Sequence, residues 1–117
     1  MKTFLLTILF ILINTICFAR DYNFRWQPNI DPDLAGYNIY RREVGEEYSS
    51  TPRVHILCRA NDDTCTKATD YNVDPNILYY YVATAFDDEG FESEYSEEAD
   101  TSQADPLVSE PIELMFK

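Results

Sequence analysis

The sequence VDPNILYYYVATAFD occupies residues 73–87 and alternates with a period of two after its proline. One side of the alternation carries Tyr79, Tyr81, Ala83 and Ala85, and the other carries Tyr80, Val82, Thr84 and Phe86. This is the period of a half-buried strand, whereas an amphipathic helix repeats about every 3.6 residues. Pro75 fixes its φ angle and lacks a backbone donor, so we expect a turn there and a strand that begins at about Ile77.

Tyr79 lies four residues after this proline. In Greek-key sandwiches a tyrosine so placed can enter the core and turn its hydroxyl back onto the corner backbone, an arrangement called a tyrosine corner. We therefore predict that the Tyr79 hydroxyl bonds to the backbone of this turn. The residues that we predict for the structural core are Trp26, Tyr37, Tyr79 and Tyr81.

Short strands are also predicted along the rest of the chain. Their expected positions are residues 22–26, 37–42, 53–58, 66–71 and 93–99. Two prolines and Gly36 punctuate the loop between the first two strands, and Glu89-Gly90 suits a turn that needs a positive φ. No stretch longer than about six residues has helical periodicity, so the predicted fold class is all-β.

Two segments resemble fibronectin type III domains of the bacterial secreted kind. Residues 73–87 are similar to the corner and the strand that follows it, and residues 26–42, WQPNIDPDLAGYNIYRR, are similar to the second and third strands with their loop. The resemblance covers roughly Tyr22 to Ala99. It implies an immunoglobulin-like Greek-key β-sandwich of six to seven strands, in which the usual N-terminal strand A is missing or replaced, because only Arg20 and Asp21 would precede the first strand.

An additional tail, residues 105–117, follows the expected domain at residues 20–104. Its end alternates Ile112, Leu114 and Phe116 with Glu113 and Met115. This is the pattern of a strand with one buried face. We expect it either to take the place of the missing strand A at the open sheet edge of its own domain or to join the sheet of a partner.

Residues 1–19 have the features of a cleaved secretory signal peptide. Lys2 provides the positively charged N-terminal region, and Phe4 to Ile13 is apolar apart from Thr7. The small residues Cys17 and Ala19 stand at positions −3 and −1 relative to the expected cleavage site. A membrane anchor is the rival interpretation, but the ~16 residues from Phe4 to Ala19 would span only about 24 Å of helix, less than the roughly 30 Å of a bilayer core. We expect a secreted or periplasmic protein without stable membrane insertion after cleavage.

Cys58 and Cys65 are then the remaining cysteines, an even number in a chain directed to an oxidising compartment. The residues between them are mostly polar and turn-forming. We predict a disulfide that closes this short loop, worth ~2–3 kcal/mol in the chain-entropy estimate. A zinc site is disfavoured, because it needs four ligands and only His55 could add to the two cysteines.

The chain is strongly acidic, with a net charge of −12 that becomes −13 once Lys2 is removed. Such a charge excludes nucleic acid as an expected partner and favours basic proteins or metal ions. Residues 87–105 contain nine acidic residues and no Lys or Arg, which is typical of a solvated segment.

Catalysis is not expected. The one histidine, His55, falls in a predicted edge strand, the mature cysteines are paired, and no nucleophile has a base beside it in the sequence. Asp31 and Asp33 could act as an acid–base pair, but nothing else converges on them. No phosphate-binding glycine motif occurs.

The fibronectin-like topology would bring three loops to one end of the sandwich. These loops carry the only candidate metal ligands, Asp31, Asp33, Asp62, Asp63, Asp87, Asp88 and Glu89. Ca²⁺ is the ion that such carboxylates would suit, but their spacing matches no dedicated calcium loop. The alternative is a solvated acidic rim without a cofactor.

A candidate binding surface is predicted on the outward face of the central strands. It consists of Tyr40, Tyr80, Val82 and Phe86. If these side chains are contiguous, they form an apolar patch that binds a partner or the chain's own tail.

From these patterns we expect a non-catalytic binding or accessory module that recognises a protein or glycan through its loops or this sheet face. A secreted inhibitor or effector of a basic protein and a calcium-dependent adhesion subunit are the alternatives. The neighbouring gene products would discriminate best among them.

Overall fold

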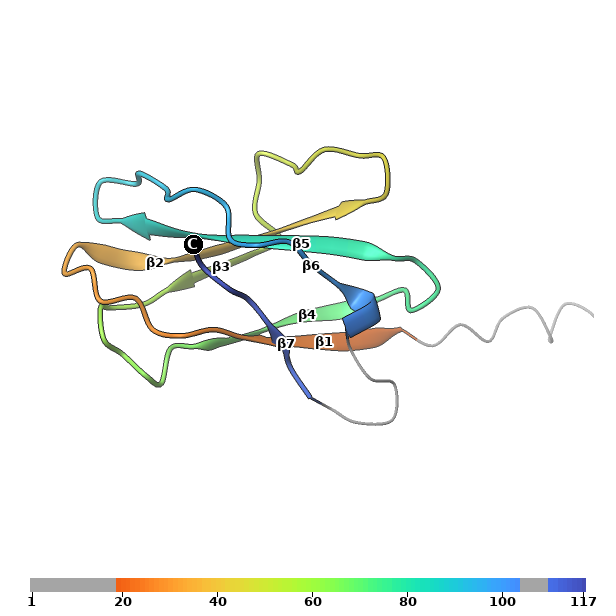
Figure 1. The fold of residues 1–117 in the computed structure, drawn as a ribbon, viewed down its shortest axis with the longest axis horizontal. Coiled ribbons are helices and arrows are strands. Elements are labelled where there is room, and N and C mark those ends of the chain that lie inside the picture. The colour runs from red at the N-terminus through yellow and green to blue at the C-terminus, as the bar shows by residue number, and fades with distance from the viewer. Residues whose placement is uncertain (1–18, 104–109) are drawn as a thin grey trace, which may run out of the picture.

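The computed structural model describes residues 19–103 and 110–117. The predicted signal peptide, apart from Ala19, lies outside the described residues, and so does the junction between the expected domain and its tail. The strands are β1 (Arg20–Arg25), β2 (Leu34–Glu43), β3 (Val54–Leu57), β4 (Lys67–Val73), β5 (Tyr79–Asp87), β6 (Ala99–Asp100) and β7 (Ile112–Glu113), and Thr101–Gln103 form a 3-10 helix (Figure 1). None of the described segments is a helix with the length and hydropathy needed to cross a membrane.

The strands form two sheets that face each other as the layers of a sandwich (Figure 1). The three-stranded sheet has the order β4-β1-β7, and the four-stranded sheet has the order β3-β2-β5-β6. The central pair is β2 with β5, which run antiparallel from Leu34 opposite Asp87 to Glu43 opposite Tyr79. The predicted all-β, two-layer architecture is confirmed.

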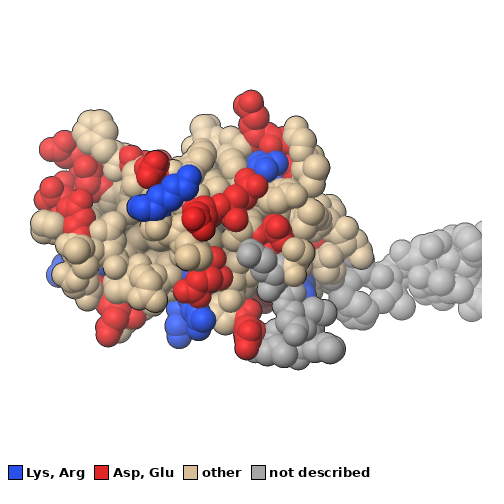
Figure 2. All heavy atoms as spheres, viewed as in Figure 1, with Lys and Arg blue, Asp and Glu red and all other residues tan. Residues whose placement is uncertain are grey.

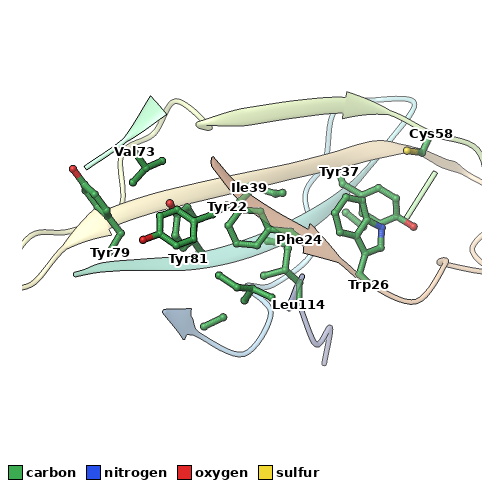
Figure 3. Packing of buried hydrophobic residues seen from close by; sticks show 14 of the residues in the cluster. Tyr22, Phe24, Trp26, Tyr37, Ile39, Cys58, Val73, Tyr79, Tyr81 and Leu114 are labelled. Atoms are coloured by element: carbon green, nitrogen blue, oxygen red, sulfur yellow. The ribbon is translucent and has the colours of Figure 1, made fainter. Parts of the chain in front are cut away.

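Aromatic side chains dominate the core between the sheets (Figure 3). The ring centroids of Phe24 and Tyr81 lie 4.6 Å apart, and those of Trp26 and Tyr37 lie 5.0 Å apart. Tyr79 is buried at one end of the same cluster. Because β1 and β5 belong to different sheets, the contact between Phe24 and Tyr81 joins the two layers directly.

The prediction that the Tyr79 hydroxyl bonds to the backbone of the turn is wrong. Among the described residues, the Tyr79 hydroxyl has no hydrogen-bond partner; its ring instead lies 4.2 Å from the guanidinium carbon of Arg41. The Tyr81 hydroxyl makes the buried bond, and it donates to the Asp70 side chain at 2.8 Å rather than to the corner backbone. Tyr81 is nearer the middle of the sandwich, where β4 offers this carboxylate.

Asp70 is the centre of a buried polar network between the sheets. Its side chain is 2% exposed and accepts hydrogen bonds from Arg41 at 3.0 Å, from Arg53 at 2.9 Å and from Tyr81. Asp70 belongs to β4, whereas Arg41 and Tyr81 belong to β2 and β5. The network therefore satisfies one buried charge and also links the two layers.

Replacing Tyr81 by Phe should lower the free energy of unfolding by roughly 1–3 kcal/mol, because the substitution removes one partner of a buried carboxylate. Tyr79→Phe is the matched control and should change it little, since that hydroxyl has no partner among the described residues. Urea melts of both variants measure the difference. Equal losses would contradict the assignment of the buried bond to Tyr81.

The tail returns to its own domain. Ile112 and Glu113 pair parallel with Phe24 and Arg25 of β1, and the Leu114 amide donates to the Arg25 carbonyl at 2.9 Å. Ile112 and Leu114 are buried in the core, where Figure 3 shows Leu114 beside Phe24. The tail thus covers the edge of β1 with the inward alternation that its sequence indicates.

The same tail also reaches the other sheet. The Glu97 amide donates to the Met115 carbonyl at 2.9 Å, and the Phe116 ring lies 5.5 Å from that of Tyr37. Residues 112–116 therefore lie between the β1 edge and the segment that precedes β6. They close one side of the sandwich.

The segment before β6 is irregular, although we predicted a strand over residues 93–99. The Ser93 and Ser96 amides donate to the Ala85 and Ala83 carbonyls, and their hydroxyl oxygens accept from the amides of the same two alanines at 2.9 and 2.8 Å. Serine side chains thus replace part of the backbone ladder beside β5. Within the predicted strand and the residue that follows it, only Ala99 and Asp100 pair with β5 as a regular strand.

The predicted disulfide between Cys58 and Cys65 is confirmed. It closes the loop between β3 and β4. The Cys58 amide also donates to the Ala35 carbonyl at 2.9 Å, and the Trp26 amide donates to the Thr66 carbonyl at 3.0 Å. Both ends of the loop are therefore attached to neighbouring segments as well as to each other.

Candidate functional site

Three loops meet at one end of the sandwich, which we call the loop pole: residues 26–33, 58–66 and 88–91. The Asp88 amide donates to the Asp33 carbonyl at 3.2 Å, and the Asn61 amide donates to the Asn29 carbonyl at 2.9 Å. Direct hydrogen bonds thus join the first loop to each of the other two. The predicted meeting of these loops is confirmed, and Figure 1 shows two of them at the left end of the molecule, beyond the start of β2 and the end of β5.

The core holds the first of these loops in place. The Asn29 amide donates to the hydroxyl of the buried Tyr37 at 2.9 Å, and the Asn29 side chain accepts from the Asp31 amide at 2.8 Å. Tyr37 in turn packs on Trp26. A loop anchored in this way presents its remaining side chains without a large loss of entropy on binding.

Several carboxylates of the loop pole stabilise their own turns. Asp31 accepts from the Asp33 amide at 3.0 Å, and Asp87 accepts from the amides of Glu89 and Phe91 at 3.0 and 2.9 Å. Hydrogen bonds from the hydroxyl and the amide of Thr64 hold the pKa of Asp62 below its usual value. These bonds are the common local use of aspartate in turns.

The seven candidate metal ligands are not gathered into a cage. Within residues 19–103 and 110–117, no group of three or more His, Cys, Asp or Glu side chains is placed to hold a metal ion. Carboxylates nevertheless crowd this end, where Figure 2 shows more acidic than basic atoms at the left. The loop pole therefore presents an acidic surface.

We expect calcium to bind the loop pole with millimolar affinity at best and without ordering the loops, because no preorganised set of six to eight oxygens is found among the described residues. Calorimetric titration of the mature chain at physiological salt measures this affinity. The Asp88→Asn substitution should leave the measured heat of calcium binding unchanged. A micromolar site that this variant abolishes would restore the calcium hypothesis.

Exposed apolar side chains project from the same pole. Ile30 is 76% exposed and Phe91 is 70% exposed, and Met115 of the tail is 57% exposed. A groove of about 660 Å³ runs between residues 27–30 and residues 113–117, with Ile30 and Met115 in its lining. Phe91 lines a smaller hollow on the other side of the first loop, and Asn29 lines both.

Our sequence analysis did not assign these three residues to a binding surface. Ile30 lies between two prolines and Phe91 directly follows Gly90, so both are large apolar residues inside turns. A large apolar residue in a turn is the signal that could have identified Ile30 and Phe91, since a side chain in a surface turn does not usually reach the core.

The predicted binding surface on the outward sheet face is wrong. Tyr40 and Val82 are buried, and Tyr80 and Phe86 are partly buried. The Tyr95 ring lies 5.8 Å from that of Tyr40 and therefore covers part of this face.

Other neighbours cover the two partly buried residues of that surface. The guanidinium of Arg42 lies 4.4 Å from the Tyr80 ring, and the His55 ring stacks on Phe86 at 4.8 Å. Phe86 also fills the space above Gly36, where an added Cβ atom would lie 2.4 Å from its ring. Side chains of the domain, rather than the tail, therefore cover this face.

Glu92 forms a polar centre within this covered face. Its carboxylate accepts from the hydroxyl of Tyr40 at 2.7 Å and from that of the buried Thr84 at 2.6 Å. Burial, together with the hydrogen bond and the charge of Glu92, raises the pKa of Tyr40 to about 12. The folded protein therefore favours the neutral phenol.

This pKa predicts a loss of stability at alkaline pH. A group whose pKa is higher in the folded state contributes fully below its unfolded pKa, about 10 for tyrosine, and loses that contribution as the pH rises toward 12. We expect the free energy of unfolding of the Tyr40→Phe variant to depend less on pH between pH 10 and 12 than that of the wild type. Chemical denaturation at several pH values measures it, and an unchanged dependence in the variant would contradict the role of Tyr40.

His55 has a structural environment. Its Nδ1 atom lies 2.6 Å from the Asn38 side-chain oxygen, and its ring stacks on Phe86. No serine, cysteine or carboxylate makes a hydrogen bond to it among the described residues.

Comparison with protein-family models and with curated proteins found no match to this chain. The resemblance to fibronectin type III domains therefore rests on the sequence segments quoted above. The functional argument rests on the loop pole itself.

Proposed function

We propose that this chain is a secreted or periplasmic, non-catalytic binding module that recognises a basic protein through its loop pole. The observation that carries the proposal is the exposure of Ile30 and Phe91 among carboxylates on hydrogen-bonded loops, with the exposed Met115 of the tail lining the same groove as Ile30. Large apolar side chains at the centre of a polar rim are the usual composition of a protein-binding surface.

The charge of the chain supports a basic partner. The net charge of −12 includes the carboxylates of the loop pole, among which Asp33, Asp63 and Asp88 form no salt bridge with the described residues. A basic partner would approach faster and would be oriented by this field. The same field would repel a second copy of the chain.

The orientation of the domain leaves the loop pole free. β1 begins at Arg20, at the end of the sandwich opposite to the loops (Figure 1). The disulfide in the β3–β4 loop is compatible with an oxidising compartment and supports the proposed export.

The fold that we propose is the fibronectin type III kind of sandwich, with the tail in place of a missing first strand. Two packed sheets, an antiparallel central pair and loops gathered at one end support it. A secreted inhibitor of a basic protein is the second candidate function, because it would use the same acidic and apolar surface.

Photocrosslinking in the native secreted fraction tests the proposal. A benzophenone side chain at position 91 should form a discrete adduct with one basic protein, which excess unlabelled chain removes. The matched control carries the same group in place of Tyr71, which is 63% exposed in β4. Adducts of equal yield at both positions, or none at position 91, would contradict binding through the loop pole.

A further inference from the structure

A second groove lies on the outer face of the four-stranded sheet, which we call the tyrosine groove. It has a volume of about 480 Å³ and is lined by Arg42, Glu46, Glu47, Tyr48, Tyr95 and Glu98. These residues come from the end of β2, from the loop between β2 and β3, and from the irregular segment before β6. Figure 2 shows basic atoms among acidic ones at the upper right, where Figure 1 places that loop.

Hydrogen bonds hold one wall of the groove without a ligand. The Arg42 guanidinium binds both carboxylate oxygens of Glu98 at 3.0 and 3.1 Å, and the Tyr48 hydroxyl donates to Glu98 at 2.6 Å. Arg42 also donates to the backbone carbonyl of Glu46 at 3.5 Å. The β2–β3 loop is therefore attached to the segment before β6 across the groove.

Aromatic rings form the floor. The centroid of the Tyr95 ring lies 5.8 Å from that of Tyr40 and 5.5 Å from that of Tyr48. The guanidinium of Arg42 already lies over the Tyr80 and Tyr48 rings, at 4.4 and 5.3 Å. Tyr95 is 44% exposed, and no Lys or Arg among the described residues lies over its ring.

The unpaired polar groups at this groove are mainly acceptors. Glu98 is neutralised by Arg42, whereas the carboxylates of Glu46 and Glu47 have no ion pair or hydrogen bond with the described residues. A carboxylate accepts hydrogen bonds only, so it fits a ligand that carries donors and positive charge. A neutral sugar would satisfy these groups less well, and an anion would be repelled.

We propose that the tyrosine groove binds an organic cation, with the ammonium or guanidinium group over the Tyr95 ring and its donors on Glu46 and Glu47. The ring face attracts the cation through its quadrupole, and the two carboxylates supply the countercharge. A lysine or arginine side chain of a protein and a free alkylammonium ion share this chemistry. The site lies outside the loop pole and does not depend on it.

Titration of the ¹⁵N-labelled mature chain, followed by NMR, tests this site. The probes are the N-acetyl amides of arginine and lysine and butylammonium, with N-acetylglutamine amide and methyl glucoside as neutral controls. We expect saturable shifts of the Glu47 and Tyr95 amides with the cations alone. Stronger binding of the amino-acid amides assigns the site to a protein side chain, and stronger binding of butylammonium assigns it to a free amine.

Matched variants separate a site from general attraction to an acidic protein. Glu47→Gln and Tyr95→Ala should each weaken binding about two- to fivefold, and Tyr95→Phe should keep it because the ring remains. Asp88→Asn removes the same charge at the loop pole and should leave the affinity unchanged. Shifts spread over all acidic residues, equal weakening by Asp88→Asn, or shifts with the glucoside alone would overturn the proposal.

Discussion

Replacing Asp70 by Ala is expected to lower the free energy of unfolding by ~3–5 kcal/mol, the range for breaking a buried ion pair by removing one partner. The substitution would leave Arg41 without its carboxylate and the buried Tyr81 hydroxyl without an acceptor. Arg53 would lose less, because its side chain is 41% exposed. Since Arg41 and Tyr81 lie on the sheet opposite to β4, the loss of Asp70 would weaken the contact between the two layers.

Thermal and urea melts measure this loss, and Asp33→Asn is the control for removal of a negative charge. In a chain with a net charge of −12, that control should be neutral or slightly stabilising. In the double variant Asp70→Ala/Arg41→Met, part of the loss should be recovered, because the unpaired guanidinium is also removed. Additive losses would show that Asp70 and Arg41 do not act as a pair.

Removal of residues 110–117 should have an effect of similar size. Ile112 and Leu114 are each 2% exposed, and burial of one such side chain is worth about 1.5–3 kcal/mol. Truncation would also uncover the edge of β1, which is prone to pairing with other chains. We therefore expect a loss of several kcal/mol together with concentration-dependent self-association.

Point variants show whether packing or strand pairing is responsible. Leu114→Ala should cost about 2–5 kcal/mol, whereas Met115→Ala should cost little because that side chain is exposed. Hydrogen exchange of the Leu114 amide, which donates to the Arg25 carbonyl, should be slow at low protein concentration. Fast exchange in the monomer would contradict the return of the tail to its own domain.

Part of the candidate site could be predicted from sequence, because loops between successive strands lie at the ends of a sandwich. That residues 26–33, 58–66 and 88–91 meet at the same end was expected from the topology that the family resemblance implies. The exposure of Ile30 and Phe91 did not follow from it, since apolar residues are normally assigned to strands. The covering of Tyr40 by Tyr95 also escaped prediction, because the segment before β6 was expected to be a regular strand.

Local sequence was enough to establish the strand character, the inward face of β5 and the disulfide. Each depends on neighbours along the chain: a period of two, a proline turn, or two cysteines separated by a short polar loop. The choice of Tyr81 rather than Tyr79 to bind a carboxylate, and the return of the tail to its own domain rather than to a partner, emerged from the folded chain alone. Those contacts join residues that are separated in sequence and lie on different strands. They depend on how the two layers are staggered and on which side chain reaches the other layer. A periodic pattern along one strand contains no information about either.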